Sequence, residues 1–115
     1  MNVDIFYGDM PATPDRCIVA FEYEGQENEN TGLYNPGLKI VVRSEPSDYD
    51  QARSLIQDIE DELCKIGNEY YPELASGIII NATHYLRVYP ALGVTPIDRD
   101  PNNRRQFVQN YIILK

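Results

Sequence analysis

Residues 38–67 read LKIVVRSEPSDYDQARSLIQDIEDELCKIG, a strand pattern that passes directly into a helix pattern. In residues 38–43 apolar side chains alternate with Lys39 and Arg43, as they do in a strand with one buried face. From residue 48 onward, apolar side chains recur at spacings of three and four, which is the period of an amphipathic helix. This stretch therefore predicts a strand followed at once by a helix.

The helix is predicted over residues 48–66 from its apolar stripe and its two ends. Ser47 follows Pro46 and is expected to be the N-cap, and acids in the first turn suit the positive end of the helix dipole. Lys65 in the last turn and Gly67 just beyond it mark the expected end. The apolar stripe comprises Tyr49, Ala52, Leu55, Ile56, Ile59, Leu63 and Ile66.

The rest of the chain is predicted to form strands and two long loops. The loops are residues 25–36 and 92–103, because both stretches are rich in turn residues and poor in apolar ones. Pro90 is expected to end a long strand, since proline cannot donate to a sheet ladder. The expected strands cover residues 17–24, 38–43, 77–89 and 105–114, with a further short strand at Val3–Tyr7.

This order of elements predicts one α+β domain over residues 1–115. Its sheet is expected to be mostly antiparallel, with four to five strands, because the strands follow one another in runs. One long amphipathic helix is expected to pack on one face of that sheet. A chain of 115 residues is long enough to build such a core without disulfides or metals.

The balance of charge argues against several kinds of partner. The chain has ten Lys and Arg residues and eighteen Asp and Glu residues, so the formal net charge is −8. Specific nucleic-acid binding and binding to an anionic membrane are not expected, because both depend on surplus cations. Arg99, Arg104 and Arg105 form one small basic cluster, interpreted as a salt-bridged loop. The helical acids at residues 58–62 are interpreted as a solvated face.

The cysteines and the N-terminus point to a reducing compartment. Cys17 and Cys64 stand outside any paired motif and are expected to be buried free thiols. The N-terminal residues carry no basic segment and no apolar run of signal length. We therefore expect synthesis and folding in a cytoplasm.

The sequence contains no recognisable catalytic or metal-binding motif. His84 is the only histidine, and zinc sites and general-base catalysis both need further partners at set spacings. The alternate acids of residues 98–102 resemble the opening of a calcium loop, but Asn103 and Gln109 stand where that loop needs Gly and Glu. We therefore expect a protein that is not an enzyme, with no catalytic residues, no cofactor and no metal.

Three segments of the sequence belong together: IFYGDMPATPDRCIVAFEY at 5–23, NPGLKIVVRS at 35–44 leading into DYDQARSLIQDIEDEL at 48–63, and DRDPNNRRQFVQNYII at 98–113. Their succession resembles the minor capsid or tail terminator (tail completion) proteins of long-tailed bacteriophages. In that family a proline-bearing turn precedes the first long strand, and a strand of the type P-G-(L/I)-x-(I/V)-x-V-R runs into a helix of the A…I…L type. The last strand of the family reads roughly R-x-F-S-V-N-Y.

The sequence departs from the family pattern at two places. Members of the family usually have a helix ahead of the first strand, whereas only four residues precede Ile5 here. We therefore expect one face of the sheet to be less covered. Asn103 also stands where the family commonly has a glycine before its arginine.

The resemblance implies a non-enzymatic virion assembly protein. Such a protein forms a ring of six identical subunits that caps the tail tube and provides the surface that joins the head. Its implied partners are copies of itself, the tail tube protein and the head–tail connector proteins. Its implied location is the host cytoplasm during assembly and then the virion, at the tail or the head–tail junction.

Two alternatives remain open at this point: a head–tail joining protein of the stopper type, and a small acidic protein that mimics DNA. In a ring of identical subunits two different patches must meet head to tail. The basic cluster and the helical acids are candidate complementary patches. The loop at 25–36 is expected to be mobile in the free subunit and to become ordered on a partner.

Overall fold

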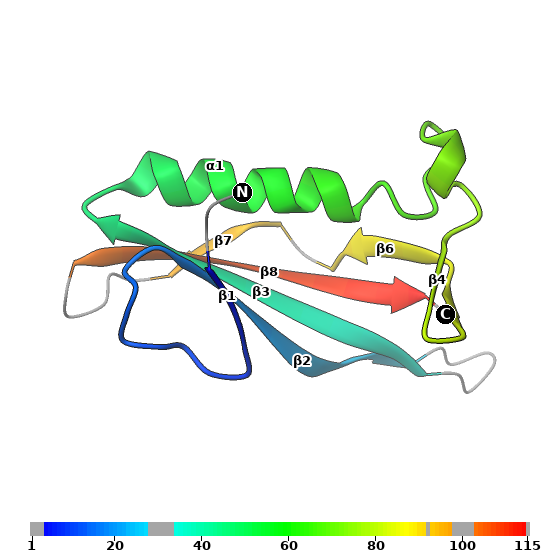
Figure 1. Cartoon of the computed structure of the whole chain (residues 1–115), viewed down its shortest axis with the longest axis horizontal. Helices are drawn as coiled ribbons and strands as arrows, with labels where there is room; N and C mark the ends of the chain where they lie inside the picture. Colours follow the sequence, from blue (N-terminus) through cyan, green and yellow to red (C-terminus); the bar gives the residue numbers. More distant parts are fainter. Residues whose placement is uncertain (1–3, 28–33, 92, 98–102, 115) are drawn as a thin grey trace.

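One α-helix lies across one face of a β-sheet in the computed structural model, which describes residues 4–27, 34–91, 93–97 and 103–114 (Figure 1). The helix α1 spans Tyr49–Leu63, and a short 3-10 helix, η1, spans Pro72–Leu74. The strands of the sheet are β1 (Asp4–Tyr7), β2 (Cys17–Glu27), β3 (Tyr34–Pro46), β6 (Arg87–Pro90), β7 (Thr95–Ile97) and β8 (Arg104–Leu114). A separate hairpin joins β4 (Ile78–Ile80) to β5 (Thr83–Tyr85).

The sheet is larger and more mixed than the sequence predicted. Its six strands run in the order β1-β2-β3-β8-β6, and β7 also pairs with β8. The pair β1–β2 is parallel, and the other pairs of this sheet are antiparallel. The prediction of a mostly antiparallel sheet of four to five strands with a long helix is therefore wrong.

Two turns in the chain account for the difference. Asn81 and Ala82 both have positive φ, 51° and 63°, so the chain reverses inside the segment predicted as one strand over residues 77–89. That reversal creates the β4–β5 hairpin and leaves only β6 to join the sheet beside β8. Residues 8–16 return the chain to the start of the sheet, which makes the expected first strand, β1, parallel to β2.

The apolar stripe of α1 is confirmed, but the helix is shorter than predicted. The N-cap is Asp48, whose Oδ1 accepts a hydrogen bond from the backbone N–H of Gln51 at 3.1 Å, and Ser47 lies outside the helix with a φ of 63°. The helix ends at Leu63, and the N–H of its C-cap Cys64 still bonds the Glu60 oxygen four residues back. The N–H groups of Lys65 and Ile66 instead bond three residues back, which tightens the chain into turns. Lys65 therefore lies beyond the last helical turn.

The core lies between α1 and the sheet strands β3, β8 and β6. Ladder partners such as Val42 and Phe107, or Leu38 and Tyr111, point to the same side of the sheet, which we call the helix face. The buried members of this core are Ile18, Ile40, Val42, Ala52, Leu55, Ile56, Val88, Phe107 and Tyr111. Tyr49 closes one end of it by placing its ring edge-on to Phe107, with 5.0 Å between centroids.

The opposite face of the sheet is covered near its β1 end by residues 8–16. Cys17, Val19 and Val41 alternate with the helix-facing residues of their strands, yet each is at most 4% exposed. The Met10 sulfur lies 3.7 Å from the Cys17 sulfur. The residues of this loop therefore keep the opposite face of the sheet covered near β1.

Both predicted loops contain strand. Gly25–Glu27 and Tyr34–Pro36 extend β2 and β3, which remain paired as far as Glu27 and Tyr34. Residues 95–97 of the second predicted loop form β7. The expected mobility of the first loop concerns residues 28–33, which lie outside the described residues, as do Arg99 and most of the calcium-like segment. Within the described chain no helix is both long and apolar enough to span a membrane.

Candidate assembly surfaces

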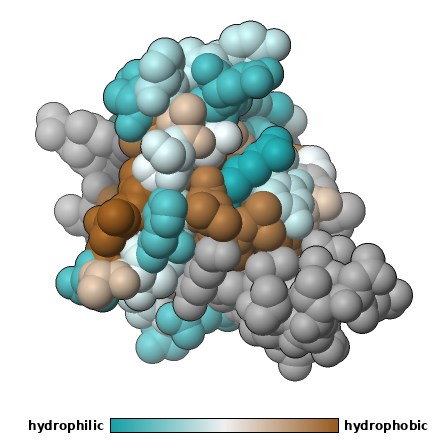
Figure 2. Space-filling model, turned by 90° about the vertical axis from the view of Figure 1, so that its right-hand side faces the viewer, coloured by the Kyte–Doolittle hydropathy of each residue, from teal (hydrophilic) through white to brown (hydrophobic). Residues whose placement is uncertain are grey.

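The β4–β5 hairpin carries the most exposed aliphatic side chain of the described chain, Ile79, with a second exposed isoleucine beside it. Ile79 is 71% exposed and Ile80 is 51% exposed, and Leu86 follows the hairpin at 46%. We call Ile79, Ile80 and Leu86 the end patch, because the hairpin stands at one end of the long axis (Figure 1). Figure 2 views that end and shows hydrophobic residues gathered at its centre with hydrophilic residues above them. Exposed aliphatic residues gathered in this way are typical of a contact surface.

The end patch was not expected from the sequence. Ile78, Ile79 and Ile80 were interpreted as the start of a long strand with one buried face. Three consecutive isoleucines do not fit such an alternation, and Asn81 directly after them favours a tight turn. These two signals were the ones in the sequence that could have located the hairpin.

A second apolar surface lies at the β1–β2 edge of the sheet. It is a groove of about 530 Å³ beside β1 and β2. We call it the edge groove, and its lining residues are Tyr7, Gly8, Ala20, Phe21, Glu22 and Leu38. Tyr7 is 78% exposed, and neighbouring Ile5 is 52% exposed. The helix face is therefore covered as far as Ile18 of β2 and open over β1.

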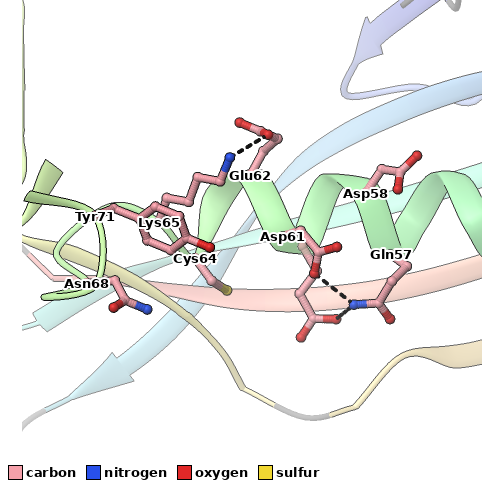
Figure 3. Close-up of a pocket in the computed structure, with 9 residues that line it drawn as sticks. Gln57, Asp58, Asp61, Glu62, Cys64, Lys65, Asn68 and Tyr71 are labelled. Atoms are coloured by element: carbon pink, nitrogen blue, oxygen red, sulfur yellow. Dashed lines mark hydrogen bonds and ion pairs between the residues drawn. The ribbon is translucent and has the colours of Figure 1, made fainter. Parts of the chain in front are cut away.

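A third surface, the acidic groove, follows the C-terminal half of α1 (Figure 3). Its volume is about 610 Å³, and its lining residues are Gln57, Asp58, Glu60, Asp61, Glu62, Cys64, Lys65, Asn68 and Tyr71. The Gln57 amide donates to Asp61 Oδ1 at 3.1 Å, and Lys65 Nζ lies 2.9 Å from Glu62 Oε1. The hydrogen bond and the charge of Glu62 raise the pKa of Lys65. Asp58, Asp61 and Glu62 are exposed, so the interpretation as a solvated face is confirmed for these three.

The cysteines and the histidine show no catalytic arrangement among the described residues. Neither Cys17 nor Cys64 forms a disulfide, and Cys17 is buried as predicted, whereas Cys64 is only half-buried. Burial, with a smaller effect from Glu60, raises the pKa of Cys64, which makes that thiol a poor nucleophile. His84 is exposed on β5 of the hairpin, and its Nε2 lies 2.6 Å from the backbone oxygen of Ser76. No group of three metal-ligating side chains occurs in the described part of the chain.

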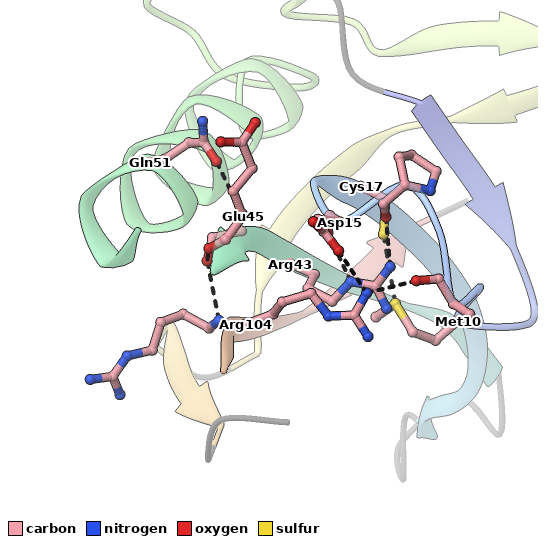
Figure 4. A network of polar contacts seen from close by, with 11 residues as sticks. Met10, Asp15, Cys17, Arg43, Glu45, Gln51 and Arg104 are labelled. Carbon is pink, nitrogen blue, oxygen red and sulfur yellow. Dashed lines mark hydrogen bonds and ion pairs between the residues drawn. The ribbon is translucent and has the colours of Figure 1, made fainter. Parts of the chain in front are cut away.

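Two buried arginines hold the proline-bearing turn against the sheet (Figure 4). Arg43, at the end of the predicted V-V-R strand, is 2% exposed. Its Nε donates to the backbone oxygen of Asp15 at 2.8 Å, and its NH2 donates to that of Pro14 at 2.7 Å. A planar guanidinium is suited to such a forked contact with two acceptors.

Arg104 contacts the same turn from β8. It is 6% exposed, and its NH1 donates to the backbone oxygen of Ala12 at 2.7 Å and lies 3.2 Å from Asp15 Oδ1. Arg104 is therefore ion-paired as expected, but from the start of a strand and to a residue distant in sequence, whereas a salt-bridged loop was predicted. It is not available as a surface cation for a neighbouring subunit. Arg105 is half-buried, with its guanidinium 5.6 Å from the centre of the Tyr49 ring.

The arginine network joins segments that lie far apart in the sequence. The places where the sequence resembles phage tail proteins include the turn at residues 12–15, the part of β3 that contains Arg43, and the start of β8 at Arg104. The three segments meet at these hydrogen bonds. They therefore share one structural role, which is to fix the crossover between β1 and β2.

Comparison with known proteins identifies the family. The chain matches the family described as bacteriophage tail terminator protein over residues 1–115. No curated protein and no solved structure matches it. The match gives no support to the alternative of an acidic DNA mimic. Because it covers the whole chain, the protein belongs to the bacteriophage tail terminator family, a family of structural proteins that act in phage tail assembly.

Proposed function

We propose that this protein forms a ring of six identical subunits that caps the tail tube and provides the surface to which the head joins. The observation that carries the proposal is the family match over the whole chain. The proposed partners are copies of the same chain, the tail tube protein and the head–tail connector proteins. We propose that it acts first in the host cytoplasm and then in the virion.

The distribution of surfaces on the subunit supports a ring. A closed ring requires heterologous contacts, in which two different patches of each subunit meet. The end patch and the edge groove are two such patches, and they lie on different elements of the fold. The acidic groove is a third surface, which the proposed ring contact does not use. It is therefore available to other components of the tail or head.

The solution mass of the purified protein tests the ring. Light scattering over a range of concentrations should reveal a species of about six times the subunit mass of 13.2 kDa. A mass that stays at one subunit at every concentration, both alone and with purified tail tubes, would contradict the proposal.

A binding assay with purified tail tubes separates a terminator from a stopper-type joining protein. A terminator should bind purified tail tubes that carry no other protein, because its proposed binding site is the exposed end of the tube. A stopper should bind only after another joining protein has been added. Binding to bare tubes is the result that we expect.

A further inference from the structure

The β4–β5 hairpin is a small, exposed element with no sheet to support it. Each strand has three residues, and β4 pairs only with β5 among the described strands. Adjacent residues of a strand point to opposite faces, so Ile79 and Ile80 expose aliphatic side chains on both faces of the hairpin. Isolated two-stranded hairpins are marginally stable in water. The hairpin therefore needs support from its base or from a partner.

Close backbone packing supplies the support at the base. Gly77 has a φ of 83°, and a Cβ at this position would lie 2.1 Å from the backbone oxygen of Tyr85. Gly67 has a φ of 79°, and its Cβ would lie 2.3 Å from the backbone oxygen of Leu86. Only glycine fits these two contacts, which fix the hairpin against the turn after α1. A partner thus meets a hairpin that is already in place, which lowers the entropy cost of binding.

The edge groove offers a complementary surface. β1 pairs with β2 only over Cys17–Ala20, and the last ladder bond is from the Gly8 N–H to the Ala20 oxygen. β2 continues to Glu27, so from Phe21 onward its outer edge has no partner strand in the described chain. A bare strand edge beside an apolar groove is the usual setting for the addition of a strand from another molecule.

The geometry of strand addition matches both surfaces. Tyr7, Ala20 and Leu38 lie on the helix face beside the edge, whereas Phe21 lies on the opposite face. A strand added at this edge places successive residues on the two faces alternately. Ile79 and Ile80 would therefore pack on opposite sides of the β2 edge.

Charge favours the same pairing. Glu22 lines the edge groove and is exposed, and Arg87 is exposed directly after the hairpin. These opposite charges flank the apolar side chains of the two surfaces, where they would assist the approach of one to the other.

We infer that the β4–β5 hairpin of one subunit docks on the edge groove of a second copy of this chain, with β4 extending the sheet at the free edge of β2. Both halves of the contact belong to every subunit, and the hairpin stands at the end of the molecule, away from β1 (Figure 1). The contact is therefore heterologous and can repeat from subunit to subunit. The inference rests on the proposed ring and names the side chains that would join its subunits.

Two single variants test the contact, with the dissociation of the purified full-length protein measured by light scattering. Ile79→Glu changes the hairpin and Tyr7→Glu changes the groove, and their wild-type side chains are 71% and 78% exposed. Each variant should keep its melting temperature and weaken self-association by about tenfold or more, as expected for an apolar contact residue. Ile97→Glu, at a 38% exposed position on β7, is the matched control and should assemble normally.

Mixing the two defective variants gives the sharpest result. The Tyr7→Glu protein keeps an intact hairpin and the Ile79→Glu protein keeps an intact groove, so the mixture should form a 1:1 pair and no ring. Normal rings from both single variants would overturn the inference and leave the proposed ring standing. Rings of Ile79→Glu that no longer bind tail tubes would also overturn it and assign the hairpin to the tube. A wild-type protein that never self-associates would overturn both proposals.

Discussion

Replacing Arg43 with methionine should remove the main anchor of the turn at residues 12–15. Methionine keeps an unbranched apolar stem like that of arginine, but it is shorter and loses the donors to the Asp15 and Pro14 oxygens. A hydrogen bond from a charged donor contributes about 1.5–3 kcal/mol, and two are lost here. Removal of a buried charge recovers part of that cost, because Arg43 is only 2% exposed. We expect a net loss of about 2–4 kcal/mol in the free energy of unfolding.

Thermal and denaturant unfolding measure this loss. For a chain of this length about 1 kcal/mol corresponds to roughly 4 °C, so the melting temperature should fall by about 10 °C. The melting temperature of Arg43→Lys should lie between those of the wild type and of Arg43→Met, because an ammonium group cannot donate to two acceptors in the same forked geometry. Arg53→Met on α1, where the guanidinium bonds only Gln57 at 3.2 Å among the described contacts, is the matched control and should change the melting temperature little. A variant Arg43→Met that melts within 2 °C of the wild type would refute the assigned role.

Four further predictions follow from the same structure. Ile56→Asp should unfold the domain in circular dichroism, because Ile56 is fully buried, while Ser54→Asp on the exposed face of α1 should fold normally. Gly77→Ala should cost about 1–3 kcal/mol in thermal melts, whereas Gly93→Ala, which has open space around it, should be close to neutral. Burial, and then Glu60, raise the pKa of Tyr111 above its usual value near 10, so stability should fall as the pH rises past about 10 and should fall less steeply in Tyr111→Phe. Duplex DNA should not bind near about 150 mM salt in a fluorescence anisotropy assay, because the net charge of −8 opposes it; submicromolar binding would contradict this.

The elements with strong periodicity were the ones that the sequence predicted well. Ala52, Leu55 and Ile56 are buried as the helical stripe required, and Leu38, Ile40 and Val42 share one face of β3. Local capping was harder to predict, because Ser47 and Asp48 are both good N-cap residues and only the backbone conformation decides between them.

The sheet was mispredicted where single residues reverse the chain. Nothing in the propensities of Asn81 and Ala82 requires both to adopt positive φ, although Asn allows it. The segment that links β1 to the parallel strand β2 is hydrogen-bonded by Arg43 and Arg104, which lie far from it in the sequence. Side chains that act through such long-range contacts cannot be recognised from local patterns.

The assembly surfaces were only partly accessible from the sequence. The helical acids at residues 58–62 were expected to be exposed to solvent, and Asp58, Asp61 and Glu62 are exposed. Arg104 does not contribute to the expected basic patch, because its side chain turns inward to Asp15. The end patch and the edge groove depend on which strands end early, which is a property of the fold rather than of any one segment.

The length of tail tubes grown in the presence of the purified protein tests the proposed function most directly. Tube subunits are polymerised with increasing amounts of the protein, and tube lengths are measured by electron microscopy, with a ring of density sought at the tube end. The proposed cap predicts that tubes become shorter as the protein is added, and that each arrested tube carries one ring at its growing end. Tubes that keep the same length distribution, with no added density at either end, would contradict it.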